Sequence, residues 1–183
     1  MYCSRFMTPD GAGFVYATGH GVTKVVIPDL SRRQGAPDSV SLPEFEPSAL
    51  SVSAAQMLER YFQGERVELN HIPVVLDGLT LFRQNVLLAT RNLLYGEICS
   101  YGQLALACGS PHAARAIGGA LAVNPVPIIV PCHRVTGSDG RLTGYSAPGG
   151  EETKRVLLVM EGINFTGAQV VTNQLVMHRV LGR

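Results

Sequence analysis

Three residues that suit nucleophilic chemistry, Cys132, His133 and Arg134, stand side by side directly after a proline. The thiolate is the nucleophilic form of cysteine, and cationic or hydrogen-bonding neighbours lower a cysteine pKa from about 8.5. These residue types therefore favour an activated thiol. Adjacent side chains on an extended segment point in opposite directions, so His133 would reach the thiol through a bend or a bridging water. Taken alone, the pair is more typical of a buried, inert thiol.

An apolar run directly precedes the cysteine. Asn124-Pro125-Val126-Pro127 leads into Ile128-Ile129-Val130, and Pro131 ends the run. Such a run between prolines predicts a rigid, buried segment that ends at Cys132.

Two short helices are expected before this run. Ser100 and Gln103 match a capping box, so the first helix begins at Tyr101 and ends near Cys108-Gly109. Ser110-Pro111 offers a cap and a first-turn proline for a second helix that runs to about residue 123. Two such helices joined by a glycine-containing turn form a helix-turn-helix candidate, although a helix pair packed in a core fits the same pattern.

The second helix has an unusually flat surface. Arg115 is the only lysine or arginine in this predicted helix. Small side chains allow a close approach to a partner, and the helix is rich in them: Ala113, Ala114, Ala116, Gly118, Gly119 and Ala120.

Strand and helix signals alternate earlier in the chain. They predict a hairpin of residues 14–17 and 22–27, a helix over 53–64 and an edge strand over 71–76. A helix capped by Thr80 is expected to continue to Tyr95-Gly96. The Asp77-Gly78 turn signal marks the domain boundary. We therefore expect domains over 1–78 and 79–165, with an extension of unknown role over 166–183.

Composition narrows the class of protein. The chain has 183 residues, 46% of them hydrophobic, which is ample for a core. Its four cysteines form no CxxC pair, and its apolar runs are far shorter than the roughly 20 residues that cross a bilayer. We expect a reduced, cytoplasmic protein outside the membrane. Net charge is −3 over residues 1–78 and +4 over 79–183, which permits a phosphate-rich partner.

The run of motifs in the second half resembles one family. Residues from about 79 to 165 look like the catalytic domain of the O6-alkylguanine-DNA alkyltransferases, also called methylated-DNA–protein-cysteine methyltransferases. Downstream of the cysteine, Gly144-Tyr145-Ser146, Lys154 and Glu161-Gly162 continue the match. Upstream and at the cysteine, the motifs occur in the family's order and spacing: Tyr95-Gly96-Glu97, Ser100 to Ala105, Ala113 to Ala120, Asn124 to Ile128, and Pro131 to Val135.

The resemblance implies a role for each reactive residue. Cys132 accepts the alkyl group from O6-alkylguanine in DNA, irreversibly and once per molecule. Glu161, His133 and a water held near Asn124 form a relay that withdraws the thiol proton. Tyr101 protonates the leaving guanine, and a phenol of pKa about 10 is able to donate towards a ring nitrogen that gains charge. No cofactor is required, and activity on O4-alkylthymine stays open.

The resemblance also implies a mode of DNA binding. Double-stranded DNA is bound through its minor groove by the small-residue helix, with Ser100, Ala113, Ala114, Gly118 and Gly119 at the interface. Arg115 fills the space left when the damaged base rotates out of the stack. The guanine pocket is formed by Tyr145 and by backbone groups of Val135 and Ser146.

The resemblance implies an α+β fold: an N-terminal α/β domain like ribonuclease H, then a mostly helical domain carrying the helix-turn-helix and Cys132. We expect a monomer. Some relatives bind zinc in the N-terminal domain, but Cys3, His20 and His71 lack a ligand spacing, so we expect no metal. The Ser146-Ala147-Pro148-Gly149-Gly150 loop departs from many relatives after its serine, which leaves the preference for methyl over bulkier groups open.

Two other classes of protein share some of these features. A protein that recognises alkylated DNA without repairing it would replace the acceptor cysteine, which is present here. A transcriptional regulator could use the helix pair alone.

Overall fold

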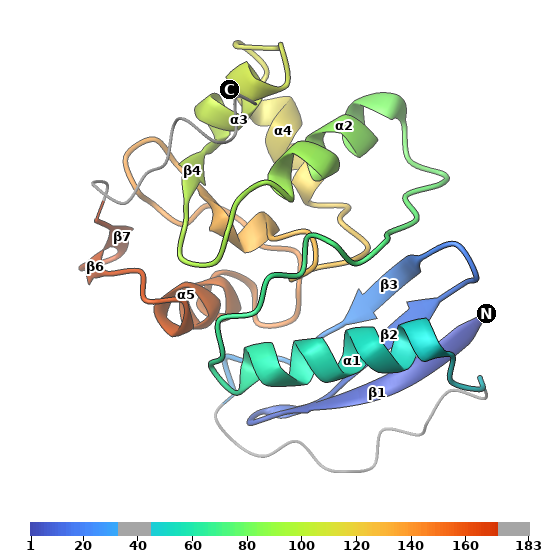
Figure 1. Ribbon diagram of the computed structural model, residues 1–183. Coiled ribbons are helices and arrows are strands. Elements are labelled where there is room, and N and C mark those ends of the chain that lie inside the picture. The colour runs from blue at the N-terminus through green and yellow to red at the C-terminus, as the bar shows by residue number, and fades with distance from the viewer. Residues whose placement is uncertain (33–44, 172–183) are drawn as a thin grey trace.

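The computed structural model describes residues 1–32 and 45–171 (Figure 1). A three-stranded sheet covered by one long helix forms the first part, and a group of shorter helices with two small strand pairs forms the second. This mixed architecture confirms the predicted α+β class.

The sheet is antiparallel in the order β1-β2-β3. Its strands are β1 (Tyr2–Thr8), β2 (Gly11–Ala17) and β3 (Val22–Val26). The β2–β3 pair confirms the predicted hairpin. Strand β1 was not predicted, because its residues Cys3, Ser4 and Arg5 do not resemble a β-branched run.

Helix α1 (Ala49–Phe62) covers the sheet and contacts β1 and β2. It begins four residues before the predicted start because Ser48 and Ser51 form a reciprocal capping box. Its buried side includes Leu58, Tyr61 and Phe62. The last two lie at the end of the helix.

The segment after α1 crosses to the second part without a strand, so the predicted strand over 71–76 is wrong. Residue Val22 makes one isolated bridge to Val74, in which the Val22 N–H donates to the Pro73 carbonyl at 2.8 Å. Pro73 has no N–H to extend the ladder.

Helix α2 (Leu81–Thr90) begins after the predicted Thr80 cap but ends well before Tyr95. At its end, Asn92 and Leu93 donate to carbonyls three residues back, so the helix tightens and stops. The Arg91 guanidinium then donates to the Ile72 carbonyl at 2.6 Å, which ties the helix to the segment from the first part.

Helix α3 (Tyr101–Ala107) follows the predicted capping box of Ser100 and Gln103. Helix α4 (Ala114–Leu121) packs against α2 and α3. It starts later than predicted and has no side-chain cap, because Ser110 closes a separate turn by accepting the Ala113 N–H at 2.9 Å.

The cysteine lies on a single turn of 3-10 helix, η1 (Cys132–Arg134), rather than on an extended segment. After η1, strand β5 (Val135–Thr136) pairs in parallel with β4 (Cys99–Ser100), which immediately precedes α3. This pairing holds the cysteine turn beside the start of α3.

Helix α5 (Gly150–Met160) and the pair β6 (Phe165–Thr166) and β7 (Gln169–Val170) complete the described chain. Val170 is buried with Ile98, Leu158 and Ile163, so the described start of the predicted extension packs on its own domain. The rest of that extension, residues 172–183, lies outside the described residues.

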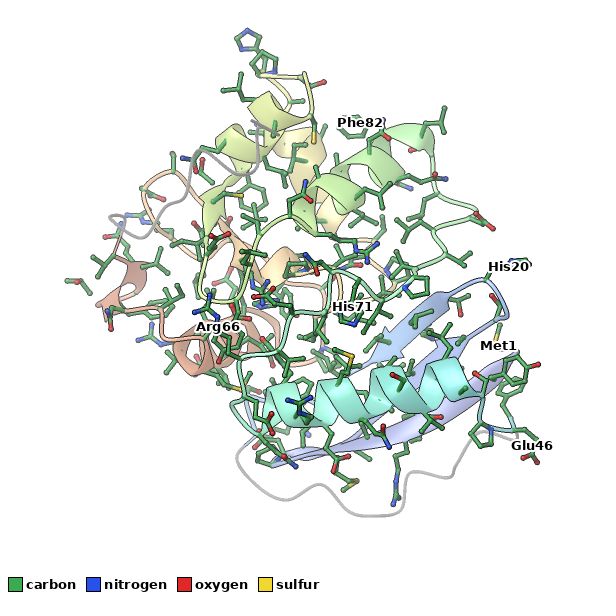
Figure 2. All side chains as sticks on the ribbon, in the orientation of Figure 1. Met1, His20, Glu46, Arg66, His71 and Phe82 are labelled. Atoms are coloured by element: carbon green, nitrogen blue, oxygen red, sulfur yellow. The ribbon has the colours of Figure 1, made fainter. Side chains whose placement is uncertain are left out.

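In the described ranges, no helix is both long enough and apolar enough to cross a membrane. His20 lies at the turn between β2 and β3 and points away from the molecule (Figure 2). No group of three or more His, Cys, Asp or Glu in these ranges is placed to hold a metal ion.

Candidate active site

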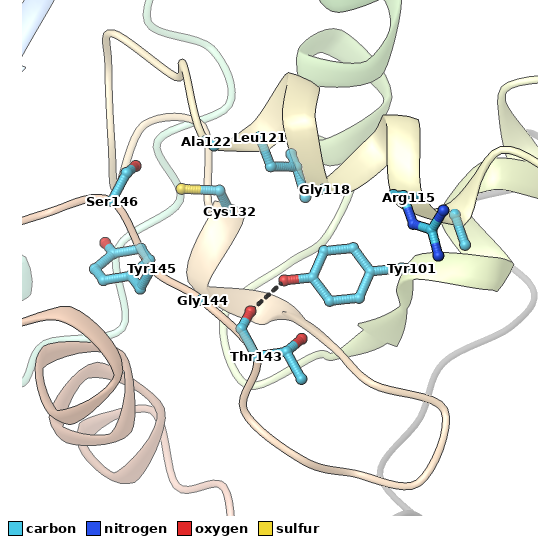
Figure 3. Close-up of a pocket in the computed structure, with 11 residues that line it drawn as sticks. Tyr101, Arg115, Gly118, Leu121, Ala122, Cys132, Thr143, Gly144, Tyr145 and Ser146 are labelled. Carbon is cyan, nitrogen blue, oxygen red and sulfur yellow. Dashed lines mark hydrogen bonds between the residues drawn. The ribbon is translucent and has the colours of Figure 1, made fainter.

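A cavity of about 630 Å³ opens beside the cysteine turn. Figure 3 shows the Cys132 sulfur pointing towards Tyr145 and Ser146. The walls come from α3, α4, η1 and the loop before α5: Tyr101, Ala114, Arg115, Gly118, Leu121, Ala122, Cys132, Thr143, Gly144, Tyr145 and Ser146.

Cys132 lies at this cavity with 6% of its surface exposed. The Asn124 Nδ2 donates to the sulfur at 3.1 Å and to the Val130 carbonyl at 2.9 Å. The Asn124 Oδ1 accepts the Val126 N–H at 3.1 Å, which fixes the amide's orientation. The asparagine is therefore held in place by the apolar run and directs one N–H at the sulfur.

The thiol is not activated at rest, contrary to the expectation from its neighbours. Burial raises the pKa of Cys132, and this outweighs the opposing influence of Asn124 and of the Lys154 charge. Arg134 does not act on the sulfur, because its guanidinium turns towards Glu161. At neutral pH the thiol keeps its proton, so a base is needed to remove it.

Glu161 is the centre of a buried polar cluster behind the cysteine. Its Oε1 lies 2.8 Å from His133 Nε2, and Arg134 donates to Oε2 at 2.8 Å and to Oε1 at 2.9 Å. Burial alone would raise the pKa of Glu161, but His133 and Arg134 outweigh it and hold that pKa well below its usual range. The carboxylate is therefore ionised and serves as an acceptor.

His133 is completely buried, and burial lowers its pKa, so it is neutral at rest. Nε2 faces the ionised carboxylate and therefore carries the ring proton. Nδ1 is buried without a hydrogen-bond partner among the described residues. It is the basic nitrogen of the ring.

Two tyrosines and a lysine complete the surroundings. The Tyr101 hydroxyl donates to the Thr143 carbonyl at 2.8 Å, as the dashed line in Figure 3 shows. Lys154 is buried 5.7 Å from the centre of the Tyr101 ring, and burial lowers its pKa to about 8. The Tyr145 hydroxyl is buried and has no partner within the described part of the chain.

The structure brings most predicted site residues together, but not all of them line the cavity. His133 and Glu161 lie behind the cysteine, and Ser100 is buried as the cap of α3. Ala113 and Gly119 lie at or on α4 outside the cavity wall. Val135 is buried, and its carbonyl accepts a hydrogen bond from Lys154 at 2.7 Å.

The comparisons with known proteins point to one family. Residues 81–163 match the family model described as "6-O-methylguanine DNA methyltransferase, DNA binding domain". A methylated-DNA–protein-cysteine methyltransferase from Haemophilus influenzae is 38% identical over 170 residues, which cover 90% of this chain and 88% of that protein. The chain belongs to this methyltransferase family.

Other family members are similar over almost their whole length. The methylated-DNA–protein-cysteine methyltransferase of Methanosarcina acetivorans is 37% identical, over 88% of this chain and 99% of that protein. The crystal structure of Mycobacterium tuberculosis OGT in complex with DNA superposes with a TM-score of 0.69 at 36% identity. The superposition covers 88% of this chain and 92% of the OGT chain. The methyltransferase assignment thus extends across both halves of the chain.

Three residues near the methyltransferase site have partners there that the sequence did not predict. Arg134 was treated as a neighbour of the thiol, and Lys154 only as part of a motif. Tyr61 falls within the predicted helix over 53–64 and has no predicted role in the site. A buried tyrosine needs a hydrogen-bond partner, which is a signal in the sequence, but the partner's identity is decided by tertiary contacts.

Proposed function

We propose that Cys132 is the residue that accepts the alkyl group in this direct-reversal DNA repair protein, and that O6-alkylguanine in DNA is the donor. The observation that carries the proposal is the placement of the Cys132 thiol at a cavity, next to the buried pair of His133 and Glu161. In the reaction a bond forms between sulfur and the alkyl carbon, while the bond from that carbon to O6 breaks.

The thiol proton leaves through His133. A water near Asn124 links the sulfur to His133 Nδ1, the ring nitrogen that lacks a protein partner in the described ranges. As His133 becomes charged, the Glu161 carboxylate at 2.8 Å stabilises it. The relay thus offsets the effect of burial on the thiol.

The departing guanine takes a proton from Tyr101. Burial raises the pKa of Tyr101, so the phenol is neutral and able to donate. Its hydroxyl lies at the cavity wall and donates to the Thr143 carbonyl until the base is bound. Charge that develops on the base would draw the proton away from this carbonyl.

DNA binds with α4 in the minor groove, and α3 and α4 act as a helix-turn-helix. Arg115 is exposed beside the cavity and replaces the base that has rotated into it. Ala113, Ala114, Gly118 and Gly119 allow the helix to approach closely, and Ser100 supports the contact by capping α3.

The flipped guanine is held by Tyr145 and by backbone groups of Ser146 and Val135. Tyr145 and Ser146 line the cavity, and the Tyr145 hydroxyl, which has no partner among the described residues, offers a polar contact. For Val135 the carbonyl is engaged by Lys154, so the base would share it or use a neighbouring group.

Further parts of the proposal concern the whole protein. The thioether on Cys132 has no path back, so each molecule acts once, without a cofactor or a metal. The protein works as a monomer in the cytoplasm. Residues 1–78 form a domain like ribonuclease H and residues 79–165 the catalytic domain; the three antiparallel strands with one helix support the first assignment.

The test is incubation with duplex DNA that contains O6-methylguanine, followed by mass spectrometry of the intact protein and its peptides. We expect one methyl mass on the Cys132 peptide and a plateau at one lesion repaired per active molecule. Cys132→Ala is the matched control and should gain no mass. Sustained multiple turnover would contradict the single-use mechanism, and binding without any mass gain would indicate a damage sensor.

A further inference from the structure

One residue of the N-terminal half reaches the buried cluster behind Cys132. Tyr61 is the penultimate residue of α1 and has no exposed surface. Its ring packs edge-on against Phe62 at 5.3 Å and against Tyr95 at 6.0 Å between ring centres. The ring is therefore held on two sides, which fixes where its hydroxyl points.

That hydroxyl lies between the two members of the relay. It donates to Glu161 Oε1 at 2.6 Å and lies 3.3 Å from His133 Nε2. Since the ionised carboxylate accepts hydrogen bonds only, the phenol proton must point at Glu161. The phenol oxygen then presents its lone pairs to His133.

Both groups that face His133 Nε2 are therefore acceptors. A nitrogen between two acceptors retains its proton, whereas an unprotonated Nε2 would face two oxygens in repulsion. We propose that Tyr61 is a positioning residue for alkyl transfer: its hydroxyl, together with the Glu161 carboxylate, holds His133 in the Nε2–H form, which keeps Nδ1 available as the base. This inference rests on the proposed relay from Cys132 to His133.

The Tyr61 phenol is protonated at neutral pH, as this positioning role requires. Burial and the nearby Glu161 charge raise the pKa of Tyr61 well above its usual value, so the group stays neutral and donates. Glu161 does not need Tyr61 to stay ionised, because Arg134 holds both carboxylate oxygens. The effect of Tyr61 therefore falls on the position and tautomer of His133 rather than on the charge of Glu161.

The test compares Tyr61→Phe with Tyr95→Phe. The first variant keeps the packed ring and removes the hydroxyl. The second removes a neighbouring hydroxyl whose hydrogen bond goes to the Met160 carbonyl rather than to His133. Two quantities are measured: the single-turnover rate of methyl transfer from O6-methylguanine duplex DNA to Cys132, and the ring ¹⁵N signals of His133. A His133→Gln variant assigns those signals among the five histidines.

For Tyr61→Phe we expect the rate to fall about tenfold, the scale of one hydrogen bond to a charged group. We also expect the His133 signals to move from the Nε2–H form towards a mixture with the Nδ1–H form. Tyr95→Phe should change the rate less than about twofold and leave the tautomer unchanged. A lower rate with unchanged His133 signals would show a packing role and overturn the proposal, as would a rate and spectrum equal to wild type.

The wild-type protein provides a second measurement if Tyr61→Phe does not fold. Its His133 should show the Nε2–H form, with a slowly exchanging Tyr61 hydroxyl proton. The Nδ1–H form in wild type would overturn the proposal. A failure of the proposed function is distinct, because wild type would then gain no methyl mass on Cys132 whatever the tautomer of His133.

Discussion

Cys132 and Glu161 are both buried, yet their surroundings favour opposite protonation states. Each carboxylate oxygen of Glu161 accepts hydrogen bonds from Arg134, whereas the Cys132 sulfur accepts one from the neutral Asn124. An ion pair offsets the cost of burial and one neutral N–H does not. The resting site therefore holds a carboxylate and a thiol, and in the proposed function the relay supplies the energy for forming the thiolate.

Replacing Asn124 with aspartate should slow alkyl transfer. Asn124→Asp keeps the oxygen that accepts the Val126 N–H but puts a negative group in place of the N–H that faces sulfur. The pKa of Cys132 should rise, and the transfer rate at neutral pH should fall about tenfold, the effect of a one-unit rise. The measurement is the pH dependence of carboxamidomethylation of the Cys132 peptide alongside the methyl-transfer rate.

The control for this variant is Asn92→Asp, which adds the same charge at an exposed position after α2. Its methyl-transfer rate and the pH dependence of its Cys132 carboxamidomethylation should match those of wild type. If Cys132 of Asn124→Asp reacts with the same pH dependence as in wild type, the asparagine has no role in stabilising the thiolate.

Replacing Glu161 with glutamine should destabilise the protein as well as stop the proposed relay. Glu161→Gln leaves the Arg134 charge buried and unpaired, which costs about 3–5 kcal/mol. Because the folded pKa of Glu161 lies below its ordinary value of 4.5, its stabilisation is complete above pH 4.5 and is lost as the pH falls. The difference in unfolding free energy between wild type and variant should therefore narrow below pH 4.5.

Urea unfolding at several pH values measures this difference. Glu65→Gln is the control, since Glu65 pairs with Arg60 at the exposed surface and should contribute about 0–1 kcal/mol. An equal loss of stability in both variants would refute the importance of the buried cluster.

At the scale of elements, α4 combines a buried side with a flat exposed one. Ile117, Ala120 and Leu121 pack inward, while Arg115, Ala116 and Gly119 are exposed. The helix forms through this packing, since no side chain caps its start. Apart from Arg115, its exposed surface carries only small residues.

Arg115→Ala should therefore weaken repair of duplex DNA more than reaction with the free alkylated base. Arg115 is exposed at the cavity edge, so its loss removes the group that we propose fills the DNA stack and leaves the thiol in place. The measurement is the ratio of transfer rates from duplex O6-methylguanine and from O6-methylguanine as a free base. Arg83→Ala, at an exposed position of α2, should keep that ratio at the wild-type value. Equal losses for both substrates in Arg115→Ala would contradict the flipping role.

At the scale of the whole molecule, the hydrophobic core does not stop at the predicted domain boundary. One cluster of buried residues runs from Phe6 and Leu58 in the first half to Leu104 and Val135 in the second. Tyr61 and Arg91 add hydrogen bonds across the same boundary. The two halves therefore share packing that neither would have alone.

We therefore expect the protein to unfold in one cooperative transition. Calorimetry should give a van't Hoff enthalpy equal to the calorimetric enthalpy, and circular dichroism should follow the same curve. Two separated transitions, with the sheet or the helices melting first, would contradict a shared core.

Local signals predicted several elements correctly. The β2–β3 hairpin and the start of α3 at Ser100 depend on residues that are near in sequence, so their pattern is visible there. The early start of α1 also has a local cause, the capping box of Ser48 and Ser51, which the predicted start at residue 53 leaves out. Strand β1 and the missing strand at Pro73 depend on which neighbours offer hydrogen bonds, and spacing does not reveal neighbours.

The sequence by itself determined the α+β class, the family and the candidate cysteine, because a long run of motifs in order is specific even when each motif is weak. Only the tertiary structure decided that Cys132 rests as a thiol, that Arg134 turns to Glu161, and that Tyr61 reaches His133. The physical reason is that a pKa and a hydrogen bond depend on burial and on atoms close in space. Here those atoms belong to residues up to 100 positions apart.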